Sequence, residues 1–114
     1  MQIEELQKQQ QEEHYQYIKN AIIDNVKRYI KQNPYSGCLD YYNNGSFLVR
    51  RKSGLPEPIW IYSHIERYFD RLVDDLRCEG IEICKVKNYE IKTKGFFKKK
   101  EYKEFKNECF KLSW

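Results

Sequence analysis

The chain has no long hydrophobic run, because its longest uncharged apolar stretch is Ile59–Tyr62. A helix that crosses a membrane needs about 20 largely apolar residues, so we expect no membrane span. The first residues, MQIEELQKQQQEE, are polar and acidic and contain no apolar segment of the kind found in secretory signals. We therefore expect a soluble, cytoplasmic protein.

Residues that carry catalysis or bind metals are also scarce. The chain has two histidines and four cysteines, and no cysteine pair forms a CxxC motif. There is no Gly-rich phosphate loop, no HExxH motif and no nucleophile elbow. We interpret the cysteines as reduced core thiols and His14 and His64 as solvated surface residues. The composition thus predicts a protein that is not an enzyme and holds no cofactor or metal.

With 114 residues, 40% hydrophobic and 33% charged, the chain fits one folded domain. The first predicted element is a helix from about Ile3 to Gln32, which Pro34 ends. Its second half carries an apolar stripe with helical spacing, made of Ile18, Ile22, Val26, Tyr29 and Ile30. Its first half has nothing aliphatic between Leu6 and Tyr15. We therefore expect a polar helical extension over residues 1–14 and a single domain over residues 15–114.

A second helix is predicted to begin at Ser63, because Ser63 and Glu66 have the spacing of a capping box. Its stripe comprises Ile65, Phe69, Leu72, Val73 and Leu76, and Gly80 suits the left-handed residue that ends many helices. Asp70, Asp74 and Asp75 are interpreted as its solvated face, paired with arginines of the same helix.

Strands are expected on both sides of this helix. The turn signal Asn43–Gly45 predicts a hairpin between residues 39–42 and 46–51, followed by a loop over residues 53–58. Ile81–Val86 is expected as a strand against the helix, and alternation predicts half-buried strands at Tyr89–Thr93 and Phe110–Trp114. The fold class is therefore α+β: two helices packed on one face of a small, mainly antiparallel sheet of three to five strands.

Positive charge is concentrated at the C-terminal end, where residues 92–114 hold eight lysines and three glutamates. Lysines contact phosphates, and interleaved aromatic residues can stack on unpaired bases. The same pattern also fits an acidic protein partner, or a Lys-protected sheet edge whose aromatic side chains point inward. The candidate binding residues of this basic aromatic surface are Phe97, Lys98, Lys99, Lys100, Tyr102 and Lys103.

A second candidate cluster lies earlier in the chain. Arg50 and Arg51 precede a loop that two prolines stiffen and that leads to Trp60. A rigid loop loses little entropy on binding, and Trp and Arg are common in interface hot spots. The alternative is that Trp60 simply leads the chain into the core.

The helix that ends at Gly80, the strand Ile81–Val86 and the final strand closing on Trp114 together resemble small α+β proteins encoded by bacteriophages and other mobile elements. This resemblance implies an anti-defence or regulatory inhibitor that would work in the host cytoplasm. We thus expect a protein-binding inhibitor that docks on a larger protein or protein–nucleic-acid complex, as a monomer or homodimer. The alternative is a small regulator that binds nucleic acid directly through the Lys-rich segment.

Overall fold

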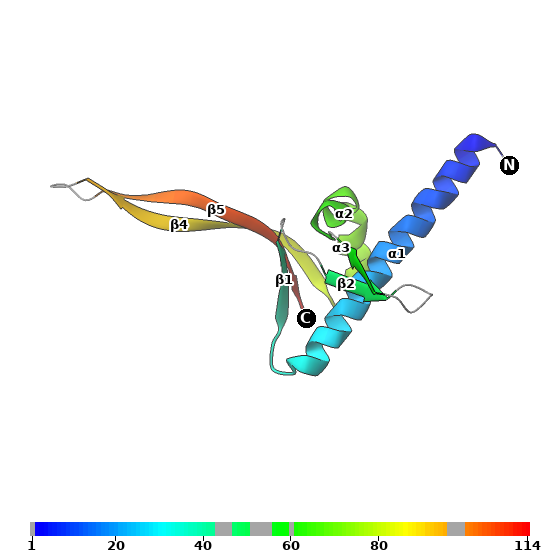
Figure 1. Cartoon of the computed structure of the whole chain (residues 1–114), viewed down its shortest axis with the longest axis horizontal. Coiled ribbons are helices and arrows are strands. Elements are labelled where there is room, and N and C mark those ends of the chain that lie inside the picture. The colour runs from blue at the N-terminus through cyan, green and yellow to red at the C-terminus, as the bar shows by residue number, and fades with distance from the viewer. Residues whose placement is uncertain (1, 43–46, 51–55, 60, 96–99) are drawn as a thin grey trace.

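The computed structural model describes residues 2–42, 47–50, 56–59, 61–95 and 100–114. They form three helices and five strands, which confirms the α+β class (Figure 1). The strands lie in two antiparallel sheets, one with the order β1-β5-β4 and one that pairs β2 with β3. In chain order the elements are α1 (Ile3–Gln32), β1 (Cys38–Tyr42), β2 (Phe47–Arg50), β3 (Pro56–Ile59), α2 (Ile61–Arg67), α3 (Phe69–Cys78), β4 (Glu82–Lys94) and β5 (Lys100–Ser113).

The long helix α1 has the predicted bounds and buries the predicted stripe. Ile18, Ile22 and Val26 are almost fully buried, while Ile30 packs against the core from its edge. Tyr15 is also fully buried and extends the stripe toward the N-terminus. Residues 2–13 are exposed, so the apolar contacts that fix α1 begin at Tyr15.

The second predicted helix is divided into α2 and α3, which meet at Tyr68. The prediction that Ser63 caps it is wrong, because α2 begins at Ile61. Ile61 is buried and lies four residues before Ile65, so the apolar stripe itself starts earlier than the capping motif. The helical end at Gly80 is confirmed: Gly80 has a φ of 79°, and the amide of Ile81 donates to the Leu76 carbonyl at 2.9 Å.

The predicted hairpin around Asn43–Gly45 is wrong. Strand β1 pairs with β5 at the other end of the chain, so that Tyr41 lies opposite Phe110. Strand β2 pairs instead with β3, which occupies part of the predicted loop and contains Pro56 and Pro58. A two-stranded sheet has only edge strands, and these tolerate proline because one side of each needs no amide donor.

The helices cover one face of the three-stranded sheet. This face contributes Tyr41, Ile83, Phe110 and Leu112 to the core, and strand register places all four on the same side. Phe110 and Leu112 are essentially inaccessible to solvent, as their alternation predicts. The central strand of the sheet is therefore β5, the last element of the chain.

Strands β4 and β5 continue well beyond the helices as a two-stranded ribbon (Figure 1). We call its outer part, Tyr89–Lys94 with Lys100–Lys106, the arm. The arm makes the molecule elongated: the radius of gyration is 18.5 Å and the longest dimension is 71 Å. A compact chain of this length would have a radius of gyration of about 13 Å.

Candidate functional site

The segment of the sequence that comprises the arm and the residues linking its two strands carries the net charge of the protein. Residues 89–106 include seven lysines and three glutamates, a surplus of four that equals the formal net charge of the whole chain, +4. The rest of the chain, residues 1–88 and 107–114, which we call the body, therefore contains equal numbers of acidic and basic residues. Lys103 and Lys106 lie on the arm, are exposed, and form no ion pair with any described residue. Their ammonium groups are available to an external anion.

One side of the arm, which we call the aromatic face, presents Tyr89, Ile91, Lys103 and Phe105. Tyr89 lies directly opposite Phe105, and Ile91 lies opposite Lys103. The two rings meet edge to face with centroids 6.0 Å apart. Tyr89 and Phe105 are each 53% exposed and Ile91 is 67% exposed. The aromatic face is therefore an apolar surface open to solvent, beside a free lysine.

The other side of the arm, the opposite face, has a different chemistry. Glu90 lies opposite Glu104, and Lys92 lies opposite Tyr102. Lys92 Nζ bonds diagonally to Glu104 at 2.7 Å, and this hydrogen bond raises the pKa of Lys92. Glu90 and Glu104 thus face each other near the body, whereas Lys94 lies opposite Lys100 at the outer end of this side.

The exposure of the arm corrects two expectations. Tyr89 and Ile91 are not half-buried, and the side chains of Tyr102 and Phe105 do not point into a core. The physical reason is that α3 ends at Cys78 and packs only on the inner part of β4, so no described element covers the outer half. An alternating strand looks the same in sequence whether or not another element covers it.

The candidate residues fall into two separate groups. Tyr102 and Lys103 lie on the arm, and Lys100 begins β5. Arg50 ends β2 in the other sheet, so strand pairing does not join the second cluster to the arm. Four of the arm and loop candidates, Phe97, Lys98, Lys99 and Arg51, lie outside the described residues, as does Trp60.

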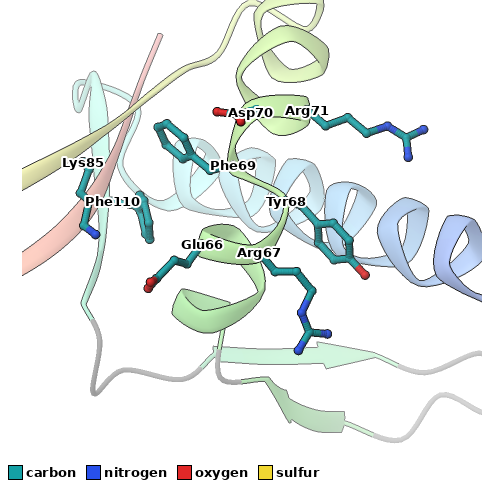
Figure 2. A pocket seen from close by; sticks show the side chains of 8 residues that line it. All are labelled: Glu66, Arg67, Tyr68, Phe69, Asp70, Arg71, Lys85 and Phe110. Carbon is teal, nitrogen blue, oxygen red and sulfur yellow. The ribbon is translucent and has the colours of Figure 1, made fainter.

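At the base of the arm lies a groove of about 450 Å³, which we call the junction groove because it follows the junction of α2 and α3. In Figure 2, Phe69 and Glu66 point toward the sheet, where Phe110 and Lys85 lie, while Arg67 and Tyr68 point away from it. The rings of Phe69 and Phe110 are 5.5 Å apart. Lys85 Nζ lies 3.4 Å from Glu108 and 5.8 Å from the Phe110 ring centroid. The groove thus combines an aromatic floor with charges of both signs.

Sequence reasoning missed a polar cluster where α1 meets the α2–α3 junction. His14 Nδ1 lies 2.7 Å from the Tyr68 hydroxyl, and the rings of His14 and His64 are 5.1 Å apart. Both histidines are partly buried rather than solvated, and His64 Nδ1 is buried without a described partner. Burial lowers the pKa of His64, helped by the nearby charges of His14 and Arg67. These residues lie 50 positions apart in sequence, so no local motif could have revealed them.

The same helix interface contains an ion pair between α3 and α1, whereas the sequence predicted that the arginines of the second helix pair with aspartates of that helix. Arg71 does not pair within its own helix but forms two hydrogen bonds, of 2.6 and 2.7 Å, to Glu12 of α1. These bonds lower the pKa of Glu12 to about 2. The guanidinium also stacks over the Tyr15 ring at 3.8 Å, and the Tyr15 hydroxyl donates to Asp75. These contacts hold α1 against α3, and we assign them a structural role.

Nothing in the described part of the chain resembles a metal centre, since no three potential ligands among His, Cys, Asp and Glu lie together there. None of the helices within the described ranges is long and apolar enough to cross a membrane. No protein-family model, curated protein or solved structure matches the chain. Its function must therefore be argued from the arm, the junction groove and the charges around them.

Proposed function

We propose that this protein is a non-enzymatic binding protein that holds nucleic acid with its arm. The observation that carries the proposal is that the segment 89–106, whose two strands form a protruding ribbon with exposed aromatic side chains, holds the entire surplus of positive charge in the sequence. Lysines on such an element contact phosphates and release counterions. A two-stranded ribbon is also one of the few protein elements narrow enough to follow a groove or strand of nucleic acid.

The exposure of the arm argues against a purely structural role. An uncovered two-stranded hairpin is at best marginally stable in water. Exposed apolar side chains on such a hairpin contribute little to the stability of the fold, but they provide a surface that a ligand can contact. The same surface suits nucleic acid bound within a larger protein–nucleic-acid complex.

Salt dependence tests the proposal directly. Fluorescence anisotropy with labelled DNA and RNA oligonucleotides would be measured at about 50 and about 200 mM salt. If about four lysines contact phosphates, the affinity for a single strand should fall about fifty-fold over this range. Changing Lys103 and Lys106 to Gln should weaken binding and reduce the slope of log K against log salt by about 1 to 2.

A matched control removes the same charge from the body. Lys27 and Lys31 are exposed on α1, so the double change Lys27→Gln and Lys31→Gln alters the net charge equally. It should leave the salt slope nearly unchanged. Equal losses in the two double variants would show that binding follows net charge and not the arm. Absence of binding at about 50 mM salt would refute the proposal.

An inhibitor that docks on an acidic protein surface, as mobile elements encode, is the second candidate function. The observation in its favour is the strand order β1-β5-β4, in which no described strand pairs with the outer edge of β4, so that a partner strand could add there. This candidate would take precedence if oligonucleotides fail to bind. A defined acidic protein would then have to bind with an affinity that depends on Lys103 and Lys106.

A further inference from the structure

We infer, on the basis of the function proposed above, that the ligand of the arm is a single strand of nucleic acid whose unpaired bases stack on the aromatic face. The two rings that would receive bases are Tyr89 and Phe105. They are cross-strand neighbours on the arm, and about half of each side chain is open to solvent. Aromatic stacking is tolerant of base identity, so the site needs no sequence preference.

Lysines flank this aromatic pair on the same face. Lys87 lies two residues before Tyr89 on β4, and Lys103 lies two residues before Phe105 on β5. Side chains two residues apart on a strand share a face and are separated by about 7 Å. One lysine therefore lies next to each ring along its strand. The same face also carries two carboxylates, because Glu108 lies opposite Lys87 and Glu101 lies two residues before Lys103.

The chemistry of this face favours unpaired bases over a duplex. In a duplex the faces of the bases are already stacked on each other, so the exposed surfaces of Tyr89, Ile91 and Phe105 would meet a charged backbone and gain little. A single strand offers the base faces themselves. Of the described arm residues, the opposite face contributes one aromatic ring, that of Tyr102, so the pair of adjacent rings that two bases could use lies on the aromatic face.

The aromatic face also continues into the junction groove. Lys85 and Phe110 are register partners and line the groove. Lys85 lies four residues before Tyr89 on β4 and therefore on the same side of the sheet. This separation corresponds to about 13 Å. The aromatic floor of the groove, formed by Phe69 and Phe110, therefore lies on the same side of the sheet as the aromatic face, with Lys87 and its register partner Glu108 between the two.

The test compares oligonucleotides with aromatic substitutions on the two faces of the arm. Probes would be a single-stranded DNA, a single-stranded RNA and a duplex DNA of the same sequence. We expect at least tenfold tighter binding to a single strand than to the duplex. Phe105→Leu and Tyr89→Leu should each weaken single-strand binding by about tenfold to a hundredfold, because each removes a stacking ring. Comparing DNA with RNA shows which backbone the face accepts better.

Tyr102→Leu is the matched control, since it removes an exposed ring from the opposite face of the same ribbon. It should change the affinity less than about threefold. All three side chains are exposed, so thermal unfolding by circular dichroism should show the same melting temperature for each variant.

The outcomes separate this inference from the function on which it rests. Tighter binding to the duplex, or equal effects at Phe105 and Tyr102, would overturn the stacking face. In that case a loss of binding on changing Lys103 and Lys106 would still support nucleic acid as the ligand. If no oligonucleotide binds at about 50 mM salt, both the stacking face and the proposed function are refuted.

Discussion

Removing the arm should abolish binding while leaving the body folded. The change replaces residues 89–106 with Asn-Gly, which joins Asn88 to its register partner Asn107 through a turn that favours tight hairpins. The core cluster contains no residue of the deleted segment. The described interactions that are lost are an exposed Lys92–Glu104 ion pair, worth about 0–1 kcal/mol, and the edge contact between the rings of Tyr89 and Phe105. The partial burial of Tyr89, Ile91, Tyr102 and Phe105 is lost as well.

The opposing terms in this deletion are similar in size. Ile91 hides only a third of its surface, and full burial of such a side chain contributes about 1.5–3 kcal/mol. Against these gains stands the backbone entropy of the deleted residues, about 1–2 kcal/mol each, which the ladder hydrogen bonds offset only in part. We therefore expect the free energy of unfolding to change by no more than about 1 kcal/mol.

Urea unfolding followed by circular dichroism measures this free energy, and the anisotropy assay measures binding. A loss of more than about 2 kcal/mol, or failure to fold, would show that the arm belongs to the cooperative core and would refute the division into body and arm. Retained affinity for oligonucleotides would show that the binding surface lies on the body.

Two further predictions concern the body. Leu72 is completely buried in the core cluster, so Leu72→Ala should lower the free energy of unfolding by about 2–5 kcal/mol, as measured by urea titration. A cost near zero would mean that Leu72 does not face the core. Because the folded state lowers the pKa of His64 below its ordinary value of 6.5, the unfolded chain binds the proton more readily. Stability should therefore be greatest above this value and fall as the pH drops below it, and His64→Gln should reduce the slope between about pH 7 and about pH 5. Urea midpoints across this range measure the effect, and an unchanged slope in the variant would contradict it.

The features that sequence reasoning predicted correctly are those that local signals specify. The stripe of α1 repeats with helical spacing from Ile18 to Ile30, so its bounds and buried face could be derived from neighbouring residues alone. Gly80 is similar, because the left-handed end of a helix requires a residue without a side chain and the next residue, Ile81, returns to the core. Neither inference needed any knowledge of distant contacts.

The errors concern pairings between distant segments. Asn43–Gly45 favours a chain reversal, but reversal does not decide which strand Cys38–Tyr42 will join. The apolar side chains of β1 gain more contact from Phe110 and Leu112 of β5, which already face the helices. The contact of His14 with Tyr68 depends in the same way on how two helices cross.

The candidate site was predicted only in part. Tyr102 and Lys103 lie on the arm as parts of an exposed basic aromatic segment. Phe105 belongs to the same interleaved segment but is not among the predicted binding residues, and the sequence assigned Tyr89 no binding role. Their alternation with polar residues placed them on one face of a strand, but it could not show that this face is uncovered. The unpaired state of Lys103 is visible only once strand register is known.

The separation of charge within the molecule has a consequence for binding. Because the body balances its acidic and basic residues, its field at a distance is weak, and the field of the arm dominates the approach of an anion. An approaching polyanion is therefore attracted first to the ribbon that extends beyond the helices. Placing the surplus lysines on an extended ribbon also keeps their mutual repulsion away from the core, where it would destabilise the fold. The arrangement thus serves association and stability together, which a uniformly basic surface on a body of this size would not do.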